Sequence, residues 1–219
     1  MPDESEVESN VVRVDARGVQ LEGNLALPVD ADGVVLFAHG SGSSRHSPRN
    51  RQVAEVLNRA GVGTLLIDLL TADEESVDNR TAQLRFDIRL LAERLIGATE
   101  WLRDLPETKE MSIGYFGAST GGGAALVASS NRKDIAAIVS RGGRPDLAGQ
   151  ALPFVEAPTL LIVGGLDGPV IEMNREAYEL LQCEKRMEIV PGATHLFEEE
   201  GKLERVAELA RDWFTGHFC

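Results

Sequence analysis

Apolar and polar residues alternate near the start of the chain, and continuous apolar runs follow. Residues 11–15 and 19–27 flank Arg17-Gly18 and alternate as the strands of a hairpin do. The later runs do not alternate, which is typical of strands buried on both faces of a mainly parallel sheet. These runs are 34–38, 62–67, 111–116, 135–139, 159–163 and 187–190.

Between these runs, apolar residues recur every three or four positions, which is the spacing of helices that pack one face on a core. The clearest pattern predicts one helix over 79–104, with Asp78 or Asn79 as its N-terminal cap. Further helices are predicted over 48–59, 120–130, 170–181 and 203–214. The alternation predicts an α/β fold with a mainly parallel sheet, an N-terminal antiparallel hairpin and helices on both faces.

The chain shows no repeat, linker or low-complexity tract, so we expect a single domain over residues 1–219. The short stretch between the runs ending at 139 and beginning at 159 leaves no room for a helical cap domain. Ligands of such sheets bind at the carboxyl ends of the strands. We therefore expect the functional residues to follow directly after these runs.

Composition narrows the classes of partner. The net charge of −13 argues against nucleic acid. The longest apolar stretches, 62–70 and 157–168, fall far short of the roughly 20 residues of a membrane-spanning helix. The acidic N-terminus has no apolar run typical of a secretory signal, so we expect a cytoplasmic protein. No clustered His/Cys spacing indicates a metal site, and no cofactor is expected.

One motif carries the candidate chemistry. Gly117-Ala118-Ser119-Thr120-Gly121 follows a predicted buried strand and precedes a predicted helix. This is a G-x-S-x-G sequence in the strand, turn and helix context that exposes a serine nucleophile. Ser119 is the candidate nucleophile, and the alternative is a glycine-rich structural turn.

A serine nucleophile needs a histidine base, which a carboxylate orients. In this strand-turn-helix context the chain order is serine, acid, histidine. Of the four histidines, His195 and His217 follow Ser119. His195 comes directly after the run 187–190, whereas no strand precedes His217, so His195 is the candidate base.

The acid is expected at the end of the strand before the histidine. Asp167 follows the run 159–163 within Gly164-Gly165-Leu166-Asp167-Gly168, whose glycines permit a tight turn. Asp146, one strand earlier, remains the alternative.

Hydrogen-bond donors and cations complete the candidate site. The backbone N–H groups of Thr120 and Ser41 are the candidate oxyanion hole, with His39 bracing the loop that contains Ser41. Arg45 in that loop and Arg141 after the run 135–139 either form structural pairs with carboxylates or receive a substrate carboxylate.

These residues resemble the dienelactone hydrolase family of α/β hydrolases over nearly the whole chain. The similarity extends from Leu36-Phe37-Ala38-His39-Gly40 through the G-x-S-x-G motif to Thr194-His195-Leu196-Phe197. It implies the α/β-hydrolase fold and a compact, lidless, cofactor-free enzyme with a Ser or Cys, Asp, His triad. Ser119, Asp167 and His195 match the triad positions. Dienelactone hydrolases proper carry cysteine as nucleophile, so this chain resembles a serine branch.

The motif and the resemblance together predict a serine esterase that cleaves a small ester or lactone through an acyl-enzyme. A thioesterase or acyltransferase would use the same residues. A catalytically silent interaction module is the alternative from another class. The expected partner is a small-molecule substrate, and the expected state is a monomer or homodimer.

Overall fold

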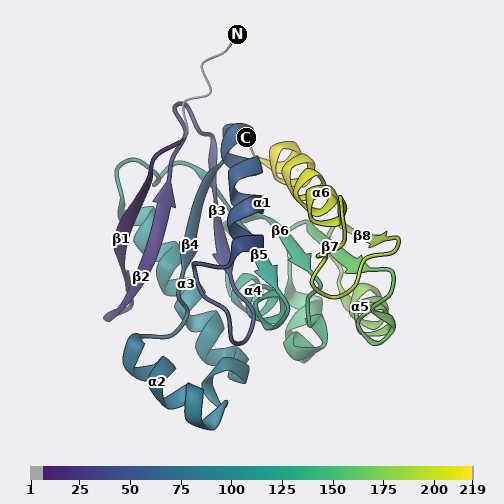
Figure 1. Ribbon diagram of the computed structural model, residues 1–219. Helices are drawn as coiled ribbons and strands as arrows, with labels where there is room; N and C mark the ends of the chain where they lie inside the picture. The colour runs from purple at the N-terminus through teal and green to yellow at the C-terminus, as the bar shows by residue number, and fades with distance from the viewer. Residues whose placement is uncertain (1–6, 219) are drawn as a thin grey trace.

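The computed structural model describes residues 7–218, which form an eight-stranded sheet with helices on both faces (Figure 1). The strand order is β1-β2-β4-β3-β5-β6-β7-β8. β1 and β2 form an antiparallel hairpin, β2 also pairs antiparallel with β4, and the other neighbours are parallel. The predicted mainly parallel sheet with an N-terminal hairpin is confirmed. The acidic N-terminus lies partly outside the described residues.

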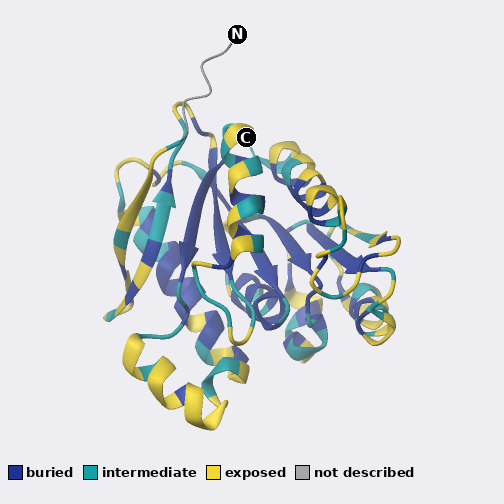
Figure 2. Cartoon of the chain, in the orientation of Figure 1, coloured by how far each residue is buried: buried dark blue, intermediate teal, exposed yellow. Residues whose placement is uncertain are grey.

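The strands are β1 (Ser9–Ala16), β2 (Val19–Ala26), β3 (Gly33–Ala38), β4 (Gly63–Ile67), β5 (Ser112–Ala118), β6 (Ile135–Arg141), β7 (Thr159–Gly164) and β8 (Lys185–Val190). Every residue of β3, β4 and β7 is buried, as Figure 2 shows for the centre of the sheet. Burial on both faces explains why these strands show continuous apolar runs rather than alternation.

Two apolar layers attach the helices to the sheet. α1 (Pro48–Arg59) and α6 (Lys202–His217) pack on one face, and α3 (Ile88–Asp104), α4 (Thr120–Ser130) and α5 (Gly168–Leu180) pack on the other. The remaining helical segments are α2 (Ala72–Thr81), η1 (Leu84–Phe86) and η2 (Pro145–Phe154). In the described structure, η2 is the only helical segment between β6 and β7, in agreement with the prediction that no cap domain is inserted there.

The prediction of one helix over 79–104 is wrong at its N-terminal end. The chain forms α2 first, beginning at a capping box between Thr71 and Glu74, and Ala82 ends it in the left-handed conformation at φ 54°. Asp87 caps α3 by accepting a hydrogen bond from the backbone N–H of Leu90 at 3.0 Å. Neither Asp78 nor Asn79 is the N-terminal cap of α3, because both lie inside α2; Asp78 instead accepts a hydrogen bond from the backbone N–H of Leu84 at 2.8 Å. The apolar spacing inside α3 is right, but local capping by side chains decided where each helix begins.

Gly97 lets α3 approach the N-terminal hairpin closely. A Cβ atom at Gly97 would lie 2.7 Å from the Cα atom of Ala16 in β1, whereas one at Gly216 in α6 would have nothing within 4 Å. We therefore expect Gly97→Ala to lower the free energy of unfolding by about 1–3 kcal/mol through overpacking. Gly216→Ala, the matched control, should be neutral or stabilising by up to about 1 kcal/mol. Urea denaturation measures both, and equal effects of the two substitutions would contradict this account.

Candidate active site

Ser119 lies at a sharp turn between β5 and α4. Its backbone adopts φ 50° and ψ −120°, a conformation that is strained for a residue other than glycine. Glycines on either side allow the turn: a Cβ atom at Gly117 would lie 2.5 Å from the carbonyl oxygen of Gly121, and one at Gly121 would lie 2.2 Å from that of Ala38. The turn thus presents the Ser119 side chain at the carboxyl edge of the sheet.

The end of β6 holds the Ser119 backbone in place. The N–H of Ser119 donates to the carbonyl oxygen of Arg141 at 3.3 Å, and the carbonyl oxygen of Ser119 accepts from the N–H of Arg144 at 3.0 Å. Two hydrogen bonds to a neighbouring segment fix both sides of the strained peptide unit, which is how such strain persists in a folded protein.

The structure brings His195 and Asp167 together. The Nδ1–H of His195 donates to Oδ2 of Asp167 at 2.6 Å, since a carboxylate oxygen can only accept. The loops that carry them pack backbone to backbone: the N–H of Leu166 donates to the carbonyl oxygen of Ala193 at 2.9 Å, and a Cβ atom at Gly164 would lie 2.5 Å from the carbonyl oxygen of Thr194. Nε2 of His195 is left to face the cavity.

Ser119 and His195 line the same cavity, which has a volume of about 250 Å³. Its other walls come from the loop after β3, the first turn of α1, the end of β6 and Leu196. These residues are Gly40, Ser41, Ser43, Ser47, Arg49, Asn50, Ala118 and Arg141. Ser119 and His195 thus share one cavity, and Asp167 is hydrogen-bonded to the histidine.

The alternative acid and base lie elsewhere. Asp146 forms an ion pair with Arg144 at 2.7 Å. His217 contacts the carbonyl oxygen of Trp213 through Nδ1 at 2.7 Å and Glu184 through Nε2 at 3.3 Å. In the part of the chain that the structure describes, the histidine that pairs with a carboxylate beside Ser119 is therefore His195.

Two free backbone N–H groups lie beside Ser119. A Cβ atom at Gly40 would lie 3.1 Å from Cβ of Ser119, so the loop after β3 rests against the serine. Among residues 7–218, the N–H groups of Ser41 and Thr120 donate no hydrogen bond to any acceptor. Unpaired donors at this position are what a developing oxyanion would need.

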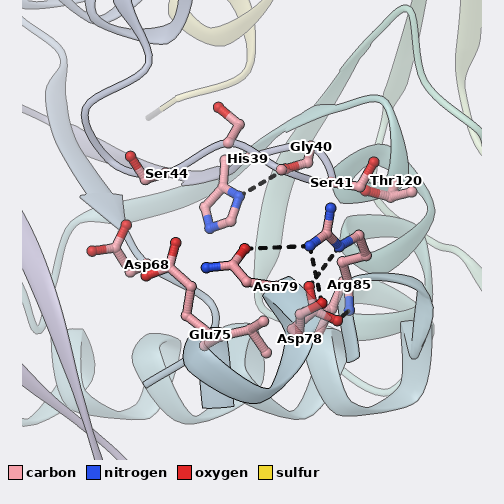
Figure 3. Close-up of a pocket in the computed structure, with 14 residues that line it drawn as sticks. His39, Gly40, Ser41, Ser44, Asp68, Glu75, Asp78, Asn79, Arg85 and Thr120 are labelled. Atoms are coloured by element: carbon pink, nitrogen blue, oxygen red, sulfur yellow. Dashed lines mark hydrogen bonds and ion pairs between the residues drawn. The ribbon is translucent and has the colours of Figure 1, made fainter. Parts of the chain in front are cut away.

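His39 braces the loop that holds Ser41. Its Nδ1–H donates to the carbonyl oxygen of Gly40 at 2.9 Å (Figure 3), and its Nε2 accepts from the N–H of Leu69 at 3.1 Å. These two bonds require the neutral ring, and burial lowers the pKa of His39. His39 therefore connects the loop after β3 to the segment after β4.

The same loop also lines a second, narrower cavity of about 40 Å³ (Figure 3). Ser41 and Thr120 reach it, but neither Ser119 nor His195 lines it. Its floor is fixed by Arg85, which donates to Asp78 through Nε at 2.5 Å and contacts Asn79 Oδ1 through Nη2 at 3.5 Å. The two cavities thus share Gly40, Ser41 and Ser43 of the loop after β3 and differ in their other side chains.

The predicted substrate-binding arginines have different environments. Arg45 forms ion pairs with Asp68 and with Glu22, the latter at 2.6 Å, and it does not line the cavity of Ser119. Arg141 does line it, is 6% exposed, and has no ion pair among the described residues. Arg45 is thus paired with carboxylates away from this cavity, whereas Arg141 lines it.

Sequence reasoning missed Arg49, which also lines this cavity. It lies in the first turn of α1 and pairs with Glu198 at 2.7 Å. The signal was an arginine at the start of a predicted helix directly after a glycine- and serine-rich loop. Among the described residues, no group of three or more His, Cys, Asp or Glu side chains is arranged to hold a metal ion, and no helix is long and apolar enough to cross a membrane.

Comparisons with known proteins agree with this fold. A family model described as the dienelactone hydrolase family matches residues 21–215. The crystal structure of a dienelactone hydrolase from Anabaena variabilis is 61% identical, with a TM-score of 0.96 over 98% of this chain and 100% of that one. An alpha/beta hydrolase, GrgF from a Penicillium species, shares the fold at 17% identity, with a TM-score of 0.78 over 97% and 99% of the two chains.

A curated relative from Mycobacterium tuberculosis, named "Putative phosphoribosyl transferase", is 57% identical over 209 residues. The match covers 95% of this chain and 46% of the relative. The chain thus spans about half the length of the curated relatives it matches.

The His39 contacts predict a pH dependence of stability. Because the folded state favours the neutral ring, the unfolded chain takes up a proton at His39 as the pH falls below about 6.5 while the folded chain does not. The free energy of unfolding should then decrease with falling pH, by at most about 1.4 kcal/mol per pH unit from this group. Urea denaturation of the wild type and of His39→Asn between pH 7.5 and 5 measures this effect. The free energy of unfolding should depend less steeply on pH in the variant, and equal slopes would contradict the assignment to His39.

Proposed function

The chain belongs to the dienelactone hydrolase family and has the α/β-hydrolase fold, and we propose that it is a serine hydrolase acting on a small carboxylic ester or lactone. The observation that carries the proposal is the 2.6 Å hydrogen bond between His195 and Asp167 in a cavity that Ser119 also lines. A volume of about 250 Å³ suits a small substrate better than a long acyl chain.

In the proposed mechanism, Ser119 Oγ attacks the ester carbonyl carbon while Nε2 of His195 takes the hydroxyl proton. Asp167 holds the imidazole in the required tautomer and stabilises the imidazolium. The N–H groups of Ser41 and Thr120 bind the oxyanion. Collapse of the tetrahedral intermediate breaks the bond to the alcohol, which leaves with the proton from His195. Water, activated by the same histidine, then releases the acid and restores Ser119.

The name given to the Mycobacterium relatives belongs to proteins about twice as long as this chain. We propose that it describes their other part, because the dienelactone hydrolase model accounts for residues 21–215 of the shared part. A thioester substrate, or transfer of the acyl group to an alcohol, would use the same residues as ester hydrolysis. The cytoplasmic location and the monomeric or homodimeric state remain predictions from the sequence.

The proposal requires an activated serine. A fluorophosphonate probe should give one adduct on Ser119, located by mass spectrometry, and none on Ser119→Ala. His195→Ala should label far more slowly, since the base that activates the hydroxyl is gone. The melting temperatures of both variants serve as the control for folding. Absence of an adduct on folded wild-type protein would favour the silent interaction module.

The assignment of the acid is tested by a matched pair of substitutions. Asp167→Asn should reduce turnover of p-nitrophenyl acetate by several orders of magnitude, on the order of 10⁴, because the histidine adopts the wrong tautomer. Asp146→Asn removes the same charge from the alternative position and should leave turnover within a few-fold of the wild type. The opposite ranking of the two variants would show that Asp146 is the acid.

A further inference from the structure

Three positive features converge on the cavity that contains Ser119. They are the Arg141 guanidinium, the Arg49 guanidinium and the N-terminus of α1, which Ser47 caps by accepting from the N–H of Asn50 at 3.3 Å. The protein as a whole is acidic, with a net charge of −13. The local concentration of positive charge therefore needs a physical explanation.

Arg141 is the most unusual of the three. Its side chain is buried, its Nε has no hydrogen-bond partner, and its Nη2 reaches only the amide oxygen of Asn50 at 3.4 Å. Burial, with a further contribution from the charge of Arg49, lowers the pKa of Arg141 to about 10. A buried cation without an anion destabilises the fold, so its retention in a folded protein indicates that an anion completes the site.

The positive charge of Arg49 is also placed unfavourably. It lies in the first turn of α1, where the helix dipole disfavours cations, and no acidic residue lies in that turn. Within the described chain its backbone N–H donates no hydrogen bond and its Nε has no partner. Glu198, whose side chain is 61% exposed, offsets only part of the charge. A helix N-terminus that carries cations instead of acids is arranged to bind an anion.

The position of the cations relative to His195 indicates which part of a substrate carries the anion. His195 must deliver its proton to the leaving alcohol, so the alcohol lies on the side of the cavity that His195 lines. Arg49, Arg141 and Leu196 line that same cavity, whereas the narrower cavity has neither His195 nor these arginines. The anion thus belongs to the alcohol part rather than to the acyl part.

We propose that the alcohol part of the substrate carries a phosphate group, which binds between the guanidinium groups of Arg141 and Arg49 at the N-terminus of α1. This inference rests on the proposed serine hydrolase function. Donors from three directions suit a tetrahedral group with three free oxygens, whereas a planar carboxylate matches a single guanidinium. The phosphate charge of −1.5 to −2 near neutral pH also offsets two cations, which one carboxylate does not.

The test uses three acetyl esters with the same acyl group and different leaving groups: phenyl acetate, 4-acetoxybenzoate and 4-acetoxyphenyl phosphate. After subtraction of spontaneous hydrolysis, the phosphate-bearing ester should have a kcat/KM about tenfold or more above both others. Inorganic phosphate should inhibit phenyl acetate hydrolysis competitively. A preference for the carboxylate, or no preference among the three esters, would overturn the proposal.

Substitutions locate the site. Arg49→Gln and Arg141→Gln should each reduce the preference for the phosphate-bearing ester, and weaken inhibition by phosphate, about tenfold. Arg59→Gln is the matched control, because it removes the same charge from the C-terminal end of the same helix, where the side chain is 77% exposed. Arg49 is partly exposed, so its variant tests the proposal even where the buried Arg141→Gln does not fold. If folded Arg49→Gln keeps the full preference for the phosphate-bearing ester, the proposed phosphate site is wrong.

The same assay separates two kinds of failure. If all three esters are hydrolysed no faster by the wild type than by Ser119→Ala, the proposed hydrolase function itself is wrong. If phenyl acetate is hydrolysed in a Ser119-dependent manner without any preference for phosphate, only the anion site is wrong.

Discussion

The site depends on a close approach of backbone to backbone at the carboxyl edge of the sheet. Ser119 adopts a positive φ only because Gly117 and Gly121 let the strand, the turn and the loop after β3 meet without side chains between them. The same device recurs at Gly164, where the loop of Asp167 meets the loop of His195. Strain at one residue is thus supported by contacts from several segments, as expected where strain serves function.

This packing also fixes what lies around the serine. The end of β6 and the residues after it bind both the N–H and the carbonyl oxygen of Ser119, and the last residue of β6, Arg141, lines the cavity. The loop after β3 supplies the Ser41 N–H and lines both cavities. His39 couples this loop to the segment after β4 and needs a neutral ring to do so. The candidate nucleophile, the candidate oxyanion donors and the two cavities are therefore held by connected segments of the fold.

The cavity that contains Ser119 is lined by two arginines, whereas the protein as a whole is acidic. An acidic protein of net charge −13 repels anions at long range, yet its one deeply buried arginine in the cavity has no carboxylate partner among the described residues. Most arginines here follow the ordinary pattern, as Arg45 does with Asp68 and Glu22. Ser119 departs from ordinary backbone geometry, and the charges of Arg49 and Arg141 are not fully compensated. The proposed binding and chemistry at these residues would offset the loss of stability that such features cause.

The sequence by itself determined which strands the three candidate residues follow. Apolar runs end shortly before Ser119, Asp167 and His195, and the periodicity of burial along each run is a local property of the chain. It did not determine the break between α2 and α3, where the side chains of Thr71, Asp78 and Asp87 override a continuing apolar period. Nor could the sequence show that Arg45 pairs with carboxylates and that Arg141 does not. Arg45 meets a carboxylate 23 positions away, and Arg141 meets only an amide 91 positions away. Pairing of charges is decided by which distant segments fold together, and only the tertiary structure contains that information.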